Sequence, residues 1–222
     1  MIPLVLASAS PSRLRVLRQA GVDPVVRPSS VDEDALVDRL GPDARPVRVV
    51  EELARAKAAD VLGRQGEELR AGFAEQGAER FVVVGCDSML LVDDRLEGKP
   101  HTVERAMERW RRVRGRHGVL LTGHALSVVD VAGGEVLHSD AATSDATVHF
   151  GNPPDADLEA YLRTGEPLEC AGAFTLESLG GWFIDRVDGD PSSVIGIGLP
   201  LLRRLLAGAG VQVRELWRPG LA

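Results

Sequence analysis

The chain has 222 residues, 44% of them hydrophobic, and its 33 acidic and 26 basic residues give a net charge of −7. The basic residues are spread among the acidic ones, which argues against a nucleic acid duplex as partner. Two cysteines, Cys86 and Cys170, show no metal-type spacing and cannot make a disulfide framework, so a reducing cytoplasm fits best.

The length allows one domain or two closely packed halves, each able to bury apolar side chains. No segment repeats at a fixed period, and no low-complexity tract separates independent halves. The N-terminus has no signal-peptide pattern, and no apolar run approaches the roughly 20 residues of a membrane span. We therefore expect a single cytoplasmic domain over residues 1–222 that does not enter a membrane.

The first elements predict a strand, a tight turn and a helix. Residues 2–7 form an apolar strand, and Ser10 is a suitable N-cap for a helix that starts at Pro11 and stops at Gly21. Free backbone N–H groups, hydroxyls and Arg13 would converge there, where negative charge is favoured. The alternative is an ordinary capped helix with no ligand.

The next segments are less distinctive. Residues 24–28 indicate a second strand, and three acids at 32–34 read as a solvated turn or as the first turn of a helix. A helix with apolar spacing starts at Pro46. Its Lys57, taken alone, is expected to face solvent. Residues 63–77 are polar and glycine-rich, typical of an extended helix end or a loop insertion.

The segment Phe81–Pro100 is the most informative part of the chain. Residues 81–84 are an apolar run typical of a strand buried on both faces, and Asp87 follows where such a strand would end. Ligands bind at the carboxyl ends of strands in open α/β sheets. A second apolar stretch turns at Asp93 and Asp94 and leads to Lys99. We therefore expect an acid, Asp87, and a base, Lys99, at the same end of the sheet.

The second half of the chain mixes strands and helices. Trp110 has the helical spacing of a core residue, and Gly133 with Gly134 is a hairpin signal between two long strands. The pattern predicts helices over 102–113, 155–163 and 199–207, and strands over 118–131, 135–150, 171–176, 182–187 and 211–213.

Several common sites are absent from the sequence. No GxxxxGK[ST] motif occurs, and the glycines late in the chain complete no dinucleotide-binding fingerprint. No histidine pair has i, i+4 spacing, which makes a zinc site improbable. These are His101, His117, His124, His138 and His149.

Eight segments in order over nearly the whole chain resemble the Maf family of nucleoside triphosphate pyrophosphatases. They read LASASPSRLRVLRQAG, VDED, ELARAKA, VVGCDS, GKP, TGHAL, GEPLECAGAF and GDPSSVIGIGLPLL. The resemblance implies a mixed α/β, inosine-triphosphatase-like fold, with an elongated twisted sheet flanked by helices and two lobes around a cleft. It also implies a homodimer and hydrolysis of a nucleoside triphosphate to monophosphate and pyrophosphate with Mg²⁺ or Mn²⁺.

The same resemblance assigns roles to individual residues. Ser8, Ser10, Arg13 and Lys57 would bind phosphate oxygens, and Lys99 would add a catalytic positive charge. Glu33 and Asp87 would hold the metal, and Asp87 would accept the proton of the attacking water. Phosphoryl transfer depends on such positioning and charge neutralisation.

Three residues, Ser12, Ser88 and Glu177, match positions associated with substrate choice in the family. A carboxylate at 177 can only accept hydrogen bonds, which suits guanine-like N–H groups or a cationic base. The segment CAGAF with Glu177 resembles the branch that acts on 7-methyl-GTP rather than the dTTP and UTP branch. The other two positions differ from that branch, so the base stays open, and Glu177 could also be a solvated turn acid.

Two other classes compete with this reading. A non-catalytic nucleotide-binding regulator would fit the link between the family and cell-division control, but binding alone does not require a carboxylate pair. A sugar nucleotidyltransferase would need a glycine-rich loop after the first strand, and SASPSR has no glycine.

Overall fold

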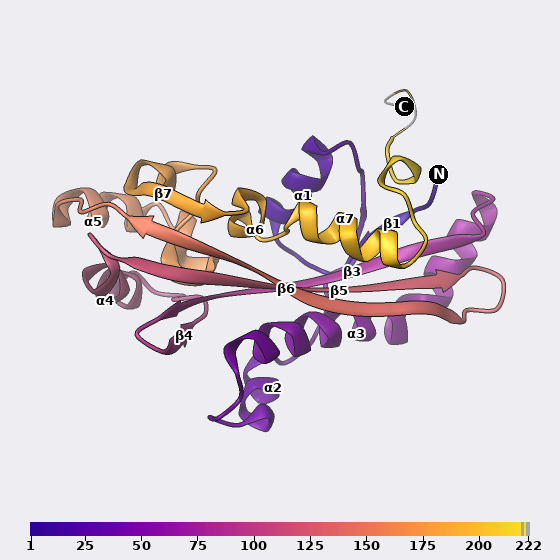
Figure 1. The fold of residues 1–222 in the computed structure, drawn as a ribbon, viewed down its shortest axis with the longest axis horizontal. Coiled ribbons are helices and arrows are strands. Elements are labelled where there is room, and N and C mark those ends of the chain that lie inside the picture. Colours follow the sequence, from indigo (N-terminus) through magenta and orange to yellow (C-terminus); the bar gives the residue numbers. More distant parts are fainter. Residues whose placement is uncertain (219, 221–222) are drawn as a thin grey trace. The chain divides into compact units, whose positions relative to one another are not determined.

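The computed structural model describes residues 1–218 and 220 and has the predicted mixed α/β architecture (Figure 1). Its seven-stranded sheet has the order β2-β1-β3-β5-β6-β7, with β4 paired to β3. The strands are β1 (Leu4–Leu6), β2 (Val25–Val26), β3 (Arg80–Val92), β4 (Arg95–Glu97), β5 (His117–Asp130), β6 (Val136–Phe150) and β7 (Ile184–Gly189). Strand β1 is parallel to β2 and β3, whereas the β3–β4 and β6–β7 pairs are antiparallel.

The α-helices are α1 (Pro11–Gln19), α2 (Glu33–Leu40), α3 (Pro46–Glu75), α4 (Val103–Val113), α5 (Asp155–Arg163), α6 (Pro191–Ile195) and α7 (Leu199–Gly208). Four 3₁₀ turns complete the described elements: η1 (Glu166–Glu169), η2 (Ala171–Ala173), η3 (Leu179–Phe183) and η4 (Val213–Glu215). Among the described residues, no helix combines the length and the apolar character needed to cross a bilayer.

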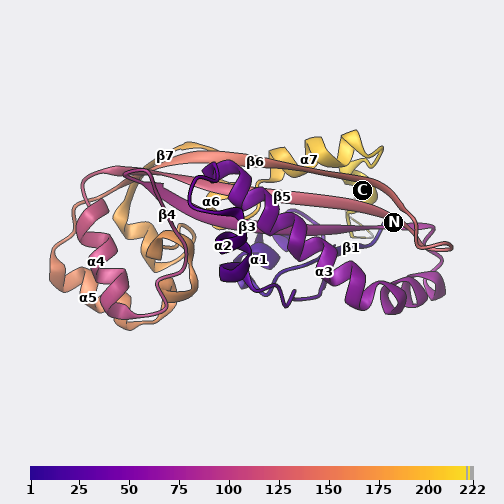
Figure 2. The same ribbon diagram turned by 90° about the horizontal axis from the view of Figure 1, so that it is seen from below.

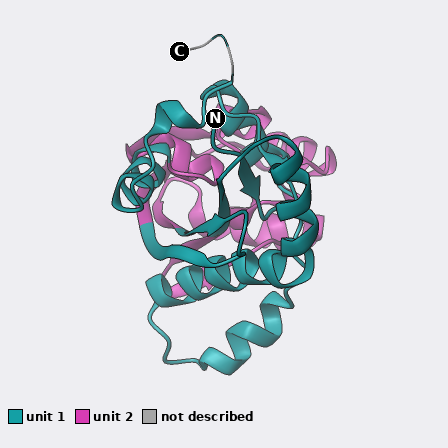
Figure 3. Ribbon diagram, turned by 90° about the vertical axis from the view of Figure 1, so that its right-hand side faces the viewer, with its two compact units in different colours: residues 1–87, 123–143, 199–222 teal, residues 88–122, 144–198 magenta. Residues whose placement is uncertain are grey.

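The chain divides into two compact units (Figure 3). Unit 1 comprises residues 1–87, 123–143 and 199–222, and unit 2 comprises residues 88–122 and 144–198. Strands β3, β5 and β6 each contribute residues to both units. Along β3 the division falls directly after Asp87.

In unit 1, helices α3 and α7 lie on opposite sides of the sheet (Figures 1 and 2). Apolar side chains of α3, such as Ala58 and Phe73, pack against β-strand residues such as Val83. Gly85 lets the helix approach β3, because a Cβ atom there would lie 2.2 Å from the carbonyl oxygen of Ala54. The close approach brings the side chains of α3 down onto the middle of β3.

In unit 2, the core is built around Trp110 of α4, which is fully buried as its spacing predicted. Its ring meets Phe150 edge-on at a centroid distance of 5.4 Å. Its indole N–H donates to the carbonyl oxygen of Ala173 at 2.7 Å. The tryptophan therefore fixes the backbone of the segment that follows Cys170 while it fills the core.

Most predicted elements are confirmed by the structure. The side chain of Ser10 caps α1 and that of Thr102 caps α4. Strands β5 and β6 are joined through Gly133 and Gly134, and helix α5 has the predicted bounds. Residues 63–75 continue α3, so they are the extended helix end and not a loop insertion.

Three predicted features are wrong. Asp87 lies in the middle of one continuous strand, β3, because Gly85 to Asp87 stay extended under α3. Residues 171–176 are not a strand, since Gly172 has a φ of 77° that strand geometry forbids. The predicted edge strand at 211–213 is also absent: a capping box between Gln212 and Glu215 turns that segment into η4.

Candidate active site

The start of α1 holds a set of groups suited to an anion. Arg13 donates from Nη1 to Ser8 Oγ at 2.9 Å, and the backbone N–H of Ser10 donates to the same oxygen at 3.2 Å. Ser10 Oγ accepts from the backbone N–H of Arg13 as the N-cap. No acid stands in the first turn of α1, so the positive end of its dipole keeps its attraction for anions.

A charge cluster, buried except for Glu33, lies at the middle of β3. Lys57 Nζ of α3 contacts Asp87 Oδ1 of β3 at 2.5 Å and Glu33 Oε1 of α2 at 2.7 Å. Lys57 and Asp87 are only 6% and 5% exposed. The expectation that Lys57 faces solvent is therefore wrong, because α3 points it at the carboxylates. A buried lysine of this kind requires paired charges.

Burial is the largest influence on Asp87 and raises its pKa above the ordinary aspartate value. The positive charges of Lys57 and Arg13 act in the opposite direction, and the negative charge of Glu33 adds to the rise. The influence of Arg13 shows that the helix start and the carboxylates share one electrostatic environment. A carboxylate with a raised pKa is a stronger base than one in bulk water.

The carboxylates of Glu33 and Asp87 are the candidate metal ligands. Both place an oxygen within 2.7 Å of one point, the Lys57 ammonium. Carboxylate oxygens are the ligands that Mg²⁺ and Mn²⁺ prefer, and Mg²⁺ commonly takes one or two of them with phosphate and water. Residues 1–218 and 220 contain no group of three or more His, Cys, Asp or Glu that could hold a metal. Two carboxylates are the protein ligands that such a cation needs when phosphate and water supply the rest.

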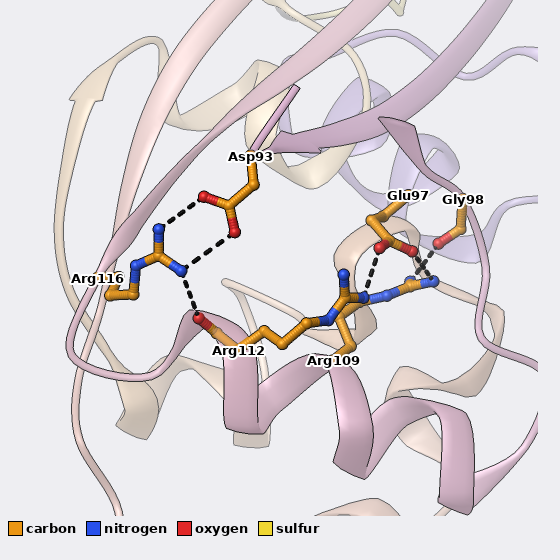
Figure 4. A network of polar contacts seen from close by, with 6 residues as sticks. All are labelled: Asp93, Glu97, Gly98, Arg109, Arg112 and Arg116. Carbon is orange, nitrogen blue, oxygen red and sulfur yellow. Dashed lines mark hydrogen bonds and ion pairs between the residues drawn. The ribbon is translucent and has the colours of Figure 1, made fainter. Parts of the chain in front are cut away.

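The segment that carries Lys99 belongs to unit 2 and is held by arginines of α4 (Figure 4). Arg109, 8% exposed, donates to the carbonyl oxygen of Gly98 at 2.5 Å and to Glu97 at 2.7 Å. Arg112 donates to the other oxygen of Glu97 at 2.5 Å. Sequence reasoning missed these arginines, although their i, i+3 spacing on one helix was a signal. The role of Lys99 itself stays a prediction.

The three specificity candidates have different surroundings. Ser12 stands in the first turn of α1, beside the anion-binding groups. Ser88 Oγ lies 3.0 Å from Thr122 Oγ1 in unit 2, and strand alternation points its side chain away from the face that carries Asp87. Glu177 follows the η2 turn in unit 2 and is partly buried. Its negative charge helps to raise the pKa of Cys170, after burial, to about 11.

The fold is a mixed α/β sheet whose central strand carries a buried aspartate paired with a buried lysine, beside a helix start with the groups an anion would need. The chain matches the model of the family described as Maf-like protein over residues 3–209. It belongs to the Maf family.

Relatives support this membership. The chain is 62% identical to a nucleoside triphosphate pyrophosphatase of Rhodococcus opacus (strain B4), over 98% of this chain and 97% of that protein. It is 54% identical to a protein of the same name from Mycobacterium marinum (strain ATCC BAA-535 / M), again over 98% and 97%. A solved nucleoside-triphosphatase / dITP/XTP pyrophosphatase from Mycobacterium abscessus matches 96% of this chain and all of its own at 14% identity, with a TM-score of 0.33.

Proposed function

We propose that the chain is a metal-dependent nucleoside triphosphate pyrophosphatase that cleaves the bond between the α and β phosphates. The observation that supports this most is the contact of the buried Lys57 with Glu33 and Asp87, in the same electrostatic environment as Arg13. The set supplies cations for a polyphosphate and carboxylates for a metal and a water, which phosphoryl transfer requires. The names of the relatives support the same activity.

In the proposed reaction, a water oxygen attacks the α-phosphorus and its proton passes to a carboxylate oxygen of Asp87. The bond from the α-phosphorus to the bridging oxygen breaks, and the electron pair leaves with pyrophosphate. Arg13 and Lys57 would hold phosphate oxygens, with Ser8 and Ser10 as hydrogen-bonding partners. Lys99 would add a further positive charge to the polyphosphate.

Glu33 and Asp87 would hold the divalent cation. When bound, such a cation neutralises phosphate charge and acidifies a coordinated water. Because Lys57 contacts the same two carboxylates, its ammonium holds them close together and opposes the rise in the pKa of Asp87 that burial causes. The lysine and the cation therefore favour the same arrangement of acids.

The direct test is a panel of dTTP, UTP, CTP, GTP and 7-methyl-GTP with Mg²⁺ or Mn²⁺, and identification of the products. Pyrophosphate and the nucleoside monophosphate in equal amounts are expected for at least one nucleotide. Orthophosphate as the only product would refute cleavage at the α–β bond. Tight binding without any product would favour the non-catalytic regulator instead.

A further inference from the structure

The carboxylate of Glu166 collects hydrogen bonds from one short segment of unit 2, residues 175–180. Thr175 Oγ1 donates to Glu166 Oε1 at 2.5 Å, and Ser178 Oγ donates to Oε2 at 2.8 Å. The backbone N–H of Gly180 donates to Oε1 at 3.3 Å, and that of Leu179 contributes as well. One side chain thus anchors the beginning, the middle and the end of the segment.

The ends of the same segment are closed on each other. The backbone N–H of Gly180 donates to Thr175 Oγ1 at 3.1 Å, and the backbone N–H of Thr175 donates to the hydroxyl of Tyr161 at 3.1 Å. A Cβ atom at Gly180 would lie 2.4 Å from both the Thr175 carbonyl oxygen and the Tyr161 hydroxyl. Only glycine allows this closure.

Glu166 is suited to be a permanent acceptor. Partial burial alone would raise its pKa, but the hydrogen bonds from Thr175, Ser178 and the backbone of Gly180 and Leu179 lower it overall. The carboxylate therefore stays ionised at neutral pH, where each donor gains a charge-assisted hydrogen bond.

Within this segment, Glu177 is held through its neighbours. Its carboxylate has no hydrogen-bond or ion-pair partner among residues 1–218 and 220, and it lies close enough to Cys170 to raise that thiol's pKa. A carboxylate on a fixed backbone can reject a base whose edge presents acceptors, because the mismatch leaves a polar group unpaired. A carboxylate on a loose backbone could move away from the mismatch.

We propose that Glu166 is a positioning residue that fixes the backbone around Glu177 and thereby sets the choice of nucleobase. This inference rests on the proposed function. Glu166 itself would not touch the substrate. Its effect would pass through the hydrogen bonds to Thr175, Ser178 and Gly180.

The test compares Glu166→Ala with Glu169→Ala. Glu169 lies on the same 3₁₀ turn, is exposed, and pairs with His101 instead of the 175–180 segment. The measured quantity is the ratio of kcat/KM between the best and the worst nucleotide of the panel. Glu166→Ala should reduce this ratio about tenfold, the size expected for one misplaced hydrogen-bonding group, and Glu169→Ala should leave it unchanged.

A double-mutant cycle shows whether the effect passes through Glu177. Glu177→Ala should lower the same ratio, and adding Glu166→Ala should change it no further. If the double variant loses selectivity by the product of the two single losses, the inference is wrong. Equal kcat/KM values for all nucleotides in the wild-type protein would also overturn it. If Glu166→Ala does not fold, Ser178→Ala decides, because it removes one donor at an exposed site.

Hydrogen exchange gives a readout that does not depend on turnover. The backbone N–H groups of Leu179 and Gly180 should exchange faster in Glu166→Ala and at wild-type rates in Glu169→Ala. Unchanged exchange in both variants would contradict the anchoring of residues 175–180 by Glu166. If the wild-type protein neither hydrolyses nor binds any nucleotide, the proposed function is wrong. A wild-type protein that hydrolyses nucleotides while Glu166→Ala keeps full selectivity would overturn the inference alone.

Discussion

At the scale of single residues, the burial of Asp87 beside Lys57 sets the chemistry proposed for the site. An aspartate that is 5% exposed carries a desolvation cost, which its raised pKa reflects. Lys57 offsets part of this cost through a contact of 2.5 Å. Such a strained arrangement of charges is common where chemistry occurs, because a carboxylate poised in this way can exchange a proton.

Asp87→Asn should therefore separate activity from stability. We expect kcat to fall by ~10²–10⁴-fold, the usual contribution of a general base. The variant should fold at least as stably as the wild type at neutral pH, since the buried charge is gone and Lys57 keeps its contact with Glu33. Steady-state kinetics and thermal unfolding check both. Near-normal turnover would remove Asp87 from the mechanism.

The pH dependence of activity follows from the same residue. Because burial raises the pKa of Asp87, kcat/KM should fall on the acidic side with a midpoint above about 4, the ordinary aspartate value. The stability effect has the opposite sign. A raised folded-state pKa contributes stability below the unfolded pKa, and that contribution is lost as pH rises through the folded pKa. A rate profile in which Asp87→Asn keeps the same acidic limb would contradict this assignment.

Lys57→Met tests the pairing itself. Removal of the ammonium leaves Asp87 buried without its main partner, so the free energy of unfolding should fall by about 3 kcal/mol at pH 7. At acidic pH the loss should shrink, because Asp87 then takes up a proton. Urea unfolding at several pH values measures this. A loss that is the same at every pH would mean that the lysine contributes packing and not charge.

At the scale of elements, the site depends on how closely α3 approaches β3. Gly85 provides the space for this contact, and Lys57 lies one turn along the helix from Ala54, which touches Gly85. The bare pattern of the sequence cannot show this, since a glycine in a strand and a lysine on a helix are common in solvent-exposed places. The roles of both residues follow only from their positions in the fold.

Two alanine substitutions in this region should have opposite effects. Gly85→Ala places a methyl group 2.2 Å from a helix carbonyl, which should lower the free energy of unfolding by ~3 kcal/mol or more. Gly63→Ala, in α3 where nothing lies within 4 Å, should raise it by about 1 kcal/mol through helix propensity. Chemical denaturation of both variants checks the pair. A tolerated Gly85→Ala would disprove the close contact.

Sequence patterns predicted the elements better than the contacts between them. Apolar spacing, the Ser10 and Thr102 caps and the glycine hairpin were sufficient for α1, α4, β5 and β6. The pattern failed where tertiary structure decides. Residues 171–176 have the composition of a strand, but side chains bind their backbone groups: the Trp110 indole N–H donates to the Ala173 carbonyl oxygen, and the Tyr161 hydroxyl accepts from the Thr175 N–H. Long-range hydrogen bonds of that kind leave no local signal.

The candidate site was predictable only in part. The order of eight short segments indicated the family, and from it the acids and bases. Within unit 1 the structure brings together Ser8, Arg13, Lys57, Asp87 and Glu33. Residue chemistry alone could not have shown that Lys57 is buried while most arginines of the helices are not, because its burial arises from the packing of α3 on β3.

At the scale of the whole molecule, local charge outweighs net charge. The chain carries a net charge of −7, which repels nucleotides at a distance. In unit 1, contacts fix Arg13 at the start of α1 and Lys57 at the middle of β3, the two places where the proposed function needs positive charge. Strand β3 carries Asp87 as the last residue of unit 1 and Ser88 as the first of unit 2 before the chain turns toward Lys99.

In the proposed reaction these groups direct water to the α-phosphorus. Hydrolysis of the preferred nucleotide in ¹⁸O-labelled water, followed by mass spectrometry of both products, measures this directly. One ¹⁸O atom in the nucleoside monophosphate and none in pyrophosphate is the predicted result. Label in pyrophosphate, or in released orthophosphate, would place the attack on another phosphorus and contradict the account.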